Sequence, residues 1–155
     1  MDLSKPSNGK IYDRIRQSWV QKTEEEIVRQ NLLAHMIDTL GYPIQLMAVE
    51  KELNTLPHLK RFQSFERRLD IVCFAKNIHH EHALYPLLIV ECKKGHLDHK
   101  AEQQVIGYNQ IVKAYFIALA NGKEVRLGYP SSADDHYQFI SYLPSYEELC
   151  RSISK

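Results

Sequence analysis

Two short stretches of this chain combine strand-forming residues with ionisable ones. Asp70 lies within the apolar run 69–74, and Glu91 and Lys93 close a second apolar run, 86–93. Because side chains alternate between the two faces of a strand, Glu91 and Lys93 fall on the same face. Charged groups are rarely buried unless they are paired or bound to a metal. The pattern therefore predicts either a divalent metal held by Asp70 and Glu91 with the lysine beside it, or a buried ion pair of Lys93 with one of the acids.

The aspartate followed by a Glu-x-Lys triplet, here Asp70 and Glu91-Cys92-Lys93, resembles the PD-(D/E)XK nuclease signature. The resemblance narrows to the N-terminal nuclease domain of type I restriction enzyme R subunits, because four further stretches occur in that family's order. They are Glu25–Gln30, Val49-Glu50, Gln104-x-x-x-Tyr108 and Ala120-Asn121-Gly122, and the whole pattern extends over roughly residues 23 to 128. Two departures are Leu69, where the family often has a proline, and the insert Asn77–His82. Neither removes a catalytic group.

The resemblance implies a site for Mg²⁺, with Mn²⁺ as a substitute. In the resembled family the metal is coordinated by the two carboxylates, here Asp70 and Glu91, and by a main-chain carbonyl, here that of Cys92. Mg²⁺ is usually held by one or two carboxylates together with water and phosphate oxygens. It lowers the pKa of bound water and polarises the phosphate. Lys93 would stabilise the developing charge or orient the attacking water, as a compact ammonium can.

Four further residues are candidate members of the site. Gln104 and Tyr108 are four apart and share one helical face. The resemblance implies that this helix lies beside the active site and supports it; the alternative is a surface glutamine over a half-buried tyrosine. Glu26 is either an acid brought to the metal by the first helix or the third residue of a capping box opened by Thr23. Glu50 is either a further acid near the site or an outward strand residue.

A basic segment directly precedes Asp70. Residues 58–68 contain four lysines and arginines against a single acid, whereas the whole chain has a net charge of +1, which by itself gives no support for nucleic-acid binding. Because phosphate contacts carry non-specific DNA binding, the segment predicts contacts with the DNA backbone, with a solvated basic loop as the alternative. The candidate nucleic-acid-binding residues are Lys60, Arg61, Arg67, Arg68 and Lys94.

Histidines and cysteines suggest zinc, but their spacing does not support it. The segment His79–His82 contains three histidines, yet adjacent residues of an extended segment point in opposite directions and no second ligand pair follows at a zinc-like spacing. We expect this segment to form the exposed tip of a hairpin. Cys73, Cys92 and Cys150 are odd in number and contain no CxxC pair, which is typical of reduced thiols.

The chain is predicted to be one α/β domain, residues 23–155, preceded by an N-terminal arm, residues 1–22. Thr23 begins an amphipathic helix that ends before Gly41, and Glu25 and Arg29 are expected to pair on it. The other predicted elements are strands over 44–53, 69–75 and 87–93, a helix over 99–114, strands over 115–120, 124–129 and 137–141, and a helix from Pro144. The order α-β-β-β-α-β matches the restriction-endonuclease-like αβββαβ core that the resemblance implies, a mixed central sheet flanked by helices.

We therefore expect a Mg²⁺-dependent nuclease that hydrolyses DNA phosphodiester bonds, a stand-alone relative of the R-subunit nuclease domain. The alternatives are a catalytically idle nucleic-acid-binding or assembly module of the same fold, and an enzyme that acts on RNA. No P-loop motif is present, so restriction or motor subunits would be encoded separately. The resemblance also allows a homodimer. Without a signal peptide or an apolar run of about 18 residues, a cytoplasmic protein with no membrane association is expected.

Overall fold

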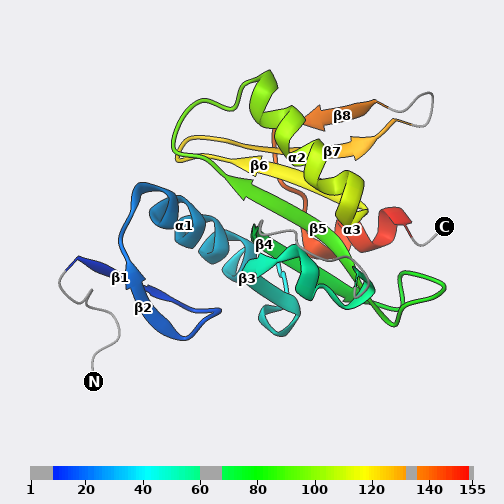
Figure 1. Cartoon of the computed structure of the whole chain (residues 1–155), viewed down its shortest axis with the longest axis horizontal. Helices are drawn as coiled ribbons and strands as arrows, with labels where there is room; N and C mark the ends of the chain where they lie inside the picture. Colours follow the sequence, from blue (N-terminus) through cyan, green and yellow to red (C-terminus); the bar gives the residue numbers. More distant parts are fainter. Residues whose placement is uncertain (1–8, 60–67, 132–135, 154–155) are drawn as a thin grey trace.

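The computed structural model describes residues 9–59, 68–131 and 136–153. Its centre is a six-stranded sheet with the strand order β3-β4-β5-β6-β7-β8 (Figure 1). The strands are β3 (Met47–Glu52), β4 (Arg68–Lys76), β5 (Leu84–Cys92), β6 (Phe116–Ala120), β7 (Val125–Pro130) and β8 (Tyr137–Ile140), and the helices are α1 (Glu24–Asp38), α2 (His99–Val112) and α3 (Tyr146–Ile153). Three short 3-10 turns are η1 (Ile44–Leu46), η2 (Leu53–Thr55) and η3 (Pro57–Leu59).

The sheet is mixed, because one of its strand pairs is parallel and the others are antiparallel. β5 and β6 run in parallel, and α2 connects them across one face of the sheet. β4 and β5 form a hairpin, and β6, β7 and β8 follow one another as antiparallel neighbours. The predicted mixed α/β sheet flanked by helices is therefore confirmed, and it is compatible with a restriction-endonuclease-like core.

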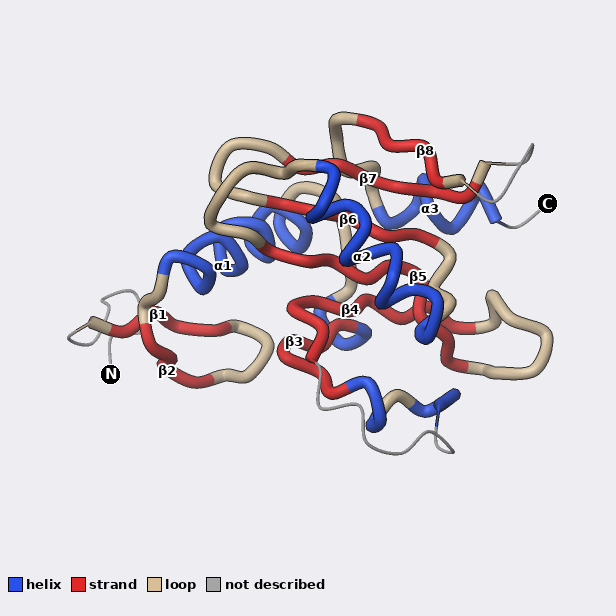
Figure 2. The backbone as a smooth tube through the Cα atoms, turned by 45° about the horizontal axis from the view of Figure 1, so that its top comes forward, coloured by secondary structure: helices blue, strands red, loops and turns tan. Residues whose placement is uncertain are grey.

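Helices cover both faces of this sheet (Figures 1 and 2). On one face, Leu33 and Met36 of α1 and Leu149 of α3 are buried against the strands. On the other face, Val105 and Val112 of α2 are buried in a second apolar cluster. The central strands are consequently apolar on both sides, as is usual where helices cover both faces of a sheet. An acid at the end of such a strand has little access to water.

Local signals explain where the helices begin and end. Thr23 caps α1, since its hydroxyl accepts a hydrogen bond from the backbone N–H of Glu26 at 3.1 Å. Gly41 follows the helix with a φ of 72°, a left-handed conformation that glycine adopts without strain. Asp98 caps α2 in the same way, through the N–H of Ala101 at 2.9 Å. The predicted positions of these two helices are confirmed.

Two strands begin elsewhere than predicted. Residues 44–46 form the turn η1, so β3 begins at Met47. β5 begins at Leu84, before Pro86, although a proline lacks the N–H that a ladder needs. The register of β4 against β5 shifts between Cys73 and Phe74, and this bulge accommodates Pro86 within the strand.

The N-terminal segment contributes a separate two-stranded hairpin. β1 (Lys10–Asp13) pairs with β2 (Ser18–Gln21) within the segment predicted as an arm. It approaches the main domain through Arg16, whose side chain contacts Glu26 of α1 at 2.8 Å and Glu50 of β3 at 3.7 Å. The hairpin therefore contributes a cation to the region where α1 and β3 meet.

Candidate active site

Asp70 and Glu91 lie beside one another at the same end of the sheet. β4 and β5 are antiparallel with Ile71 opposite Val90, so the next positions outward are Asp70 and Glu91. Asp70 Oδ2 accepts a hydrogen bond from the backbone N–H of Cys92 at 2.7 Å, which ties the start of β4 to the end of β5. The two carboxylates predicted as metal ligands are thus brought together by one hairpin.

Burial makes Glu91 an unusual acid. Its side chain is only 7% exposed, and Oε1 is buried without a hydrogen-bond partner among the described residues. Desolvation, followed by the charge of Asp70, raises the pKa of Glu91 to about 8. Desolvation also raises the pKa of Asp70, although the Cys92 N–H and the guanidinium of Arg29 oppose that rise. Burial is therefore the main reason that both pKa values are raised.

A divalent cation fits this pair of acids. Mg²⁺ prefers carboxylate oxygens, and an unpartnered buried oxygen is costly unless something binds it. Within the described ranges, no group of three or more histidine, cysteine, aspartate or glutamate side chains is placed to hold a metal. A metal here would therefore be coordinated by Asp70, Glu91 and main-chain or solvent oxygens. The carbonyl of Cys92 is the predicted main-chain ligand.

Lys93 is connected to the Gln104-x-x-x-Tyr108 pair. It follows the last residue of β5, and its Nζ donates a hydrogen bond to Gln104 Oε1 on α2. Gln104 Nε2 in turn donates to the hydroxyl of Tyr108 at 3.3 Å. The alternative prediction, an ion pair of Lys93 with Asp70 or Glu91, is not among the ion pairs formed by the described part of the chain. The helix motif therefore supports Lys93 directly.

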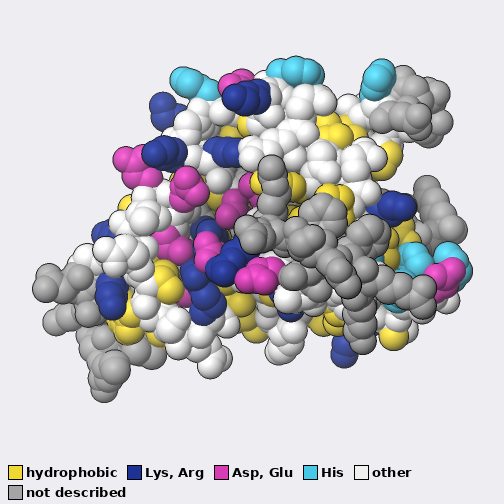
Figure 3. All heavy atoms as spheres, in the orientation of Figure 1, with side chains coloured by type: hydrophobic (Ala, Val, Ile, Leu, Met, Phe, Trp, Pro, Cys, Tyr) yellow, Lys and Arg dark blue, Asp and Glu magenta, His cyan; other side chains and the backbone are white. Residues whose placement is uncertain are grey.

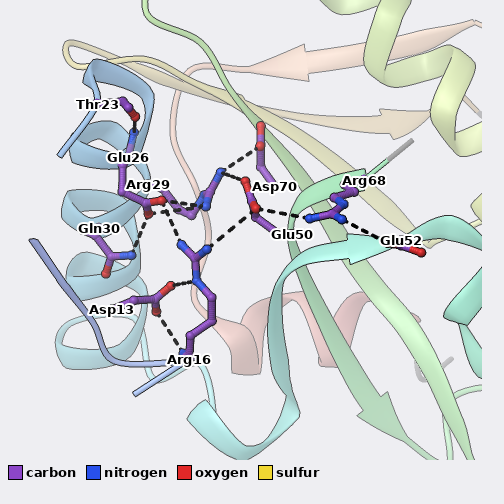
Figure 4. A network of polar contacts seen from close by, with 10 residues as sticks. All are labelled: Asp13, Arg16, Thr23, Glu26, Arg29, Gln30, Glu50, Glu52, Arg68 and Asp70. Atoms are coloured by element: carbon purple, nitrogen blue, oxygen red, sulfur yellow. Dashed lines mark hydrogen bonds and ion pairs between the residues drawn. The ribbon is translucent and has the colours of Figure 1, made fainter. Parts of the chain in front are cut away.

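An arginine missed by sequence reasoning lies beside Asp70 (Figure 4). Arg29 of α1 is 3% exposed, and its Nη2 lies 3.2 Å from both Asp70 Oδ1 and Glu50 Oε1. Its Nη1 donates to Glu26 at 3.1 Å. Burial disfavours the charged guanidinium, but these acids raise the pKa of Arg29, so the group is cationic. Arg29 thus joins three acids from three different elements.

The expected pair of Arg29 with Glu25 is wrong, because the guanidinium of Arg29 contacts Glu26, Glu50 and Asp70 instead. One signal could have indicated this. Glu26 and Arg29 continue the buried helical stripe of Leu33 and Met36, where apolar residues would be expected. Charged side chains on the buried face of a helix indicate that oppositely charged groups from other elements lie next to them.

Glu26 is held away from Asp70 by the guanidinium of Arg29. Its Oε1 accepts from Arg29 and from Arg16, and its Oε2 accepts from Gln30 Nε2 at 2.9 Å (Figure 4). Its backbone N–H bonds to the hydroxyl of Thr23, so its place in the cap is confirmed. The carboxylate itself contributes to the arginine network, and the structure does not place it next to Glu91.

Glu50 is partly exposed, and its carboxylate belongs to the arginine network. It has a φ of 51°, an uncommon value for a non-glycine residue in a strand. Its carboxylate contacts Arg29 at 3.2 Å and both Arg16 and Arg68 at 3.7 Å. Such strain is typically retained where the surroundings hold a residue in place for function.

Acids outnumber bases in this network by two. Its carboxylates belong to Asp13, Glu26, Glu50, Glu52, Asp70 and Glu91, and its cations to Arg16, Arg29, Arg68 and Lys93. One divalent ion carries the charge that would balance the excess. Burial is the main cause of the raised pKa of Glu91, and the neighbouring charge of Asp70 adds to it.

The predicted basic residues have different positions. Lys60, Arg61 and Arg67 lie outside the described residues. Arg68 contacts Glu52 at 3.1 Å and Glu50 at 3.7 Å, so acids partly neutralise it. Lys94 is exposed, directly after Lys93.

The histidine segment lies at the opposite end of the sheet, in the turn between β4 and β5. The ring of His79 stacks on Tyr85 with centroids 4.2 Å apart, and His80 is exposed. As noted above, the described residues hold no group of ligands suited to zinc. The predicted hairpin tip is confirmed, and the three cysteines are free.

The six-stranded mixed sheet between helices makes this a mixed α/β protein whose fold is compatible with a restriction-endonuclease-like core. The family model described as type I restriction enzyme R protein N terminus matches residues 24–144, and the chain belongs to this family. Membership relates the chain to type I restriction enzymes. No curated protein and no solved structure matches the chain. Among the described residues, no helix has the length and apolar character needed to cross a membrane.

Proposed function

We propose that this protein is a Mg²⁺-dependent nuclease that hydrolyses DNA phosphodiester bonds through a PD-(D/E)XK-type site. The observation that carries the proposal is the pairing of Asp70 with Glu91, whose Oε1 is buried and unpartnered and whose pKa is raised to about 8. A buried acid pair short of positive charge is what a divalent cation would stabilise. Family membership supports the same activity.

Asp70 and Glu91 would hold the metal, Mg²⁺ or Mn²⁺, with the main-chain carbonyl of Cys92 as a third ligand. When bound, the ion supplies Lewis acidity toward the phosphate and lowers the pKa of a coordinated water. The Cys92 N–H, at 2.7 Å from Asp70 Oδ2, fixes the orientation of that carboxylate. Arg29 holds the other oxygen of Asp70. The chain thus positions one ligand through two hydrogen bonds.

Lys93 would act on the phosphate itself. Its ammonium is held by Gln104, which Tyr108 orients, so the charge is fixed before substrate arrives. A fixed cation stabilises the negative charge that develops as water attacks the phosphorus, without reorganisation at that moment. In this assignment Gln104 and Tyr108 are positioning residues, and Glu26 acts through Arg29.

The proposal extends to partners and surroundings. DNA is the substrate, and separately encoded restriction or motor subunits would deliver it, as the family's connection with type I restriction enzymes suggests. A cytoplasmic location suits such a role. A homodimer would allow two sites to act on the two strands of a duplex.

The test is metal-dependent cleavage of supercoiled plasmid and of labelled single-stranded DNA and RNA. Wild type is compared with Glu91→Gln, which keeps the shape of the side chain but cannot ionise. Glu81→Gln is the matched control, since Glu81 is an exposed acid with a side chain 68% accessible, at the far end of the sheet. We expect cleavage with Mg²⁺ or Mn²⁺ that EDTA and Glu91→Gln abolish and Glu81→Gln leaves intact.

Two other results have distinct meanings. Metal binding that Glu91→Gln abolishes, without cleavage by the wild type, would indicate a competent site that requires a partner subunit. The absence of both metal binding and cleavage would contradict the proposal. It would favour the idle module, in which Arg29 alone balances the charge of Asp70.

A further inference from the structure

A hollow of about 300 Å³ lies beside the candidate site and is lined by Lys94, Gly95, His96, Asn121, Gly122 and Lys123. Its two walls are the loop between β5 and α2, residues 93–98, and the turn between β6 and β7, residues 121–124. β5 and β6 are parallel, with Cys92 opposite Ala120, so both walls leave the sheet at the end where Glu91 lies. We call this hollow the loop groove.

The loop groove is built by specific hydrogen bonds. Asn121 Nδ2 donates to the carbonyl of Gly95 at 3.0 Å, which joins the two walls. Asn121 Oδ1 accepts from the backbone N–H groups of Lys123 and Glu124 at 2.9 and 2.8 Å. This side chain therefore holds the turn and the loop in one arrangement. It gives the Ala120-Asn121-Gly122 motif a structural role that the metal site does not explain.

The rim of the groove carries cations without acidic partners. Every described arginine forms an ion pair, whereas no lysine in the described ranges does so. The nearby acid Glu124 pairs with Arg126, and Asp98 accepts from the N–H of Ala101. Lys94 and Lys123 are exposed, so their charges are available to a ligand. Figure 3 shows basic, histidine and acidic side chains together at the upper left of the molecule.

Two further features suit an extended polyanion. A Cβ atom at Gly95 or Gly122 would have no atom within 4 Å, so a ligand can approach the backbone on both walls. Glu24 and Glu25 line a separate hollow on the other side of Lys94. Their charges would repel a polyanion from the start of α1 and favour the side where Lys123 lies.

We propose that the loop groove binds the phosphate backbone of the DNA strand next to the scissile phosphate, through Lys94 and Lys123. This inference rests on the proposed function, because it places the strand relative to Asp70, Glu91 and Lys93. Phosphate contacts by lysine carry sequence-independent affinity and make it dependent on salt. The groove thus determines how tightly and in which path the strand is held, while the metal site performs the chemistry.

The experiment measures binding of fluorescein-labelled single-stranded and duplex DNA by anisotropy in EDTA, where cleavage does not interfere. Lys94→Ala, Lys123→Ala and the double variant are compared with wild type over a range of salt concentrations. The control is Lys76→Ala, an exposed lysine at the opposite end of β4. Exposed lysine variants of this kind should remain folded.

Each groove variant should reduce the slope of log K against log salt by about 0.7 to 0.9 and weaken binding roughly five- to tenfold near 0.1 M salt. The double variant should lose about twice that slope, and Lys76→Ala should behave as wild type. Slopes in Lys94→Ala and Lys123→Ala equal to that of wild type would overturn the inference. A loss of slope and affinity in Lys76→Ala as large as in the groove variants would do the same, and so would a wild type that binds no DNA. A wild type that binds DNA through the groove lysines but never cleaves it would instead count against the proposed nuclease.

Discussion

At the scale of single residues, the buried carboxyl of Glu91, whose Oε1 has no partner among the described residues, should make the stability of the metal-free protein depend on pH. The pKa of this group in the fold is about 8, above its ordinary value of 4.5. A carboxyl group whose folded pKa is raised contributes stability that is complete below its unfolded pKa and is lost as pH rises through the folded pKa. Metal-free wild type should therefore lose stability between about pH 4.5 and pH 8.

Glu91→Gln should remove this dependence, because an amide does not ionise. In EDTA the melting temperature of Glu91→Gln should fall less than that of wild type from about pH 5 to about pH 9. Glu81→Gln, at an exposed site, should follow wild type. Parallel melting curves for wild type and Glu91→Gln would mean that Glu91 is not buried as described.

Arg29 should be the cation whose removal destabilises the protein most. Its loss would leave Asp70 without an arginine partner, and would leave Glu26 and Glu50 with only the contacts to Arg16 and Arg68 at the edge of the network. Removing one partner of a buried ion pair typically costs about 3–5 kcal/mol. Arg29→Met should therefore lower the free energy of unfolding in urea by about this amount.

The matched control for Arg29→Met is Arg14→Met, because Arg14 pairs with Asp38 on the surface, with side chains 41% and 60% exposed. Exposed pairs contribute about 0–1 kcal/mol. Similar losses in the two variants would show that Arg29 is not the buried counter-ion of the acids. Mn²⁺ should restore part of the stability of Arg29→Met, since a divalent ion can replace the missing charge.

At the scale of elements, α2 serves the site by presenting Gln104 to Lys93. Gln104→Ala would free the ammonium without removing a buried group, so stability should change by less than about 0.5 kcal/mol. Misplacement of a catalytic group lowers turnover, and we expect roughly a tenfold loss in kcat, about 1.4 kcal/mol in the barrier. Gln103→Ala, on the same exposed helix turn, should retain wild-type turnover. Equal turnover in both variants would remove Gln104 from the site.

Elements and their order could be predicted from the sequence because their signals are local. The cap at Thr23, the stop at Gly41 and the apolar run of β5 each lie within a few residues of the boundary that they determine. The early start of β5 could not be predicted in the same way. It depends on a bulge in β5 itself, at Leu87, where the pairing with β4 shifts from Leu88 to Pro86.

The residues of the candidate site differ in the same way: some could be recognised from local sequence, and others could not. Asp70, Glu91 and Lys93 were recognisable because charges interrupt apolar strands. The role of Arg29 depends on Glu50 and Asp70, which are 21 and 41 residues away in the chain. A helical pattern shows that Arg29 is on a buried stripe, but only the packing of α1 against the sheet shows which acids it meets.

At the scale of the whole molecule, the charged network, the Lys93 contacts and the loop groove occupy one end of the sheet. The other end carries the histidine turn and an apolar cavity of about 760 Å³ lined by Tyr115, Leu127, Leu149 and neighbouring residues. Chemistry and substrate binding are therefore concentrated where β5 and β6 end. The buried Oε1 of Glu91, which has no partner among the described residues, should make the stability of the entire domain depend on divalent cations.

A ligand that binds only the folded state stabilises it by about 2.7 kcal/mol at a concentration of 100 times its Kd. For a domain of this size, each kcal/mol raises the melting temperature by about 2–4 °C. Mn²⁺ near that concentration should therefore raise the melting temperature of wild type by roughly 5–10 °C. NaCl at equal ionic strength should not raise it, because screening by salt does not give Glu91 Oε1 a partner. A similar rise in Asp70→Asn and Glu91→Gln would place the ion elsewhere, since both variants remove a carboxylate of the proposed pair and keep the side-chain shape.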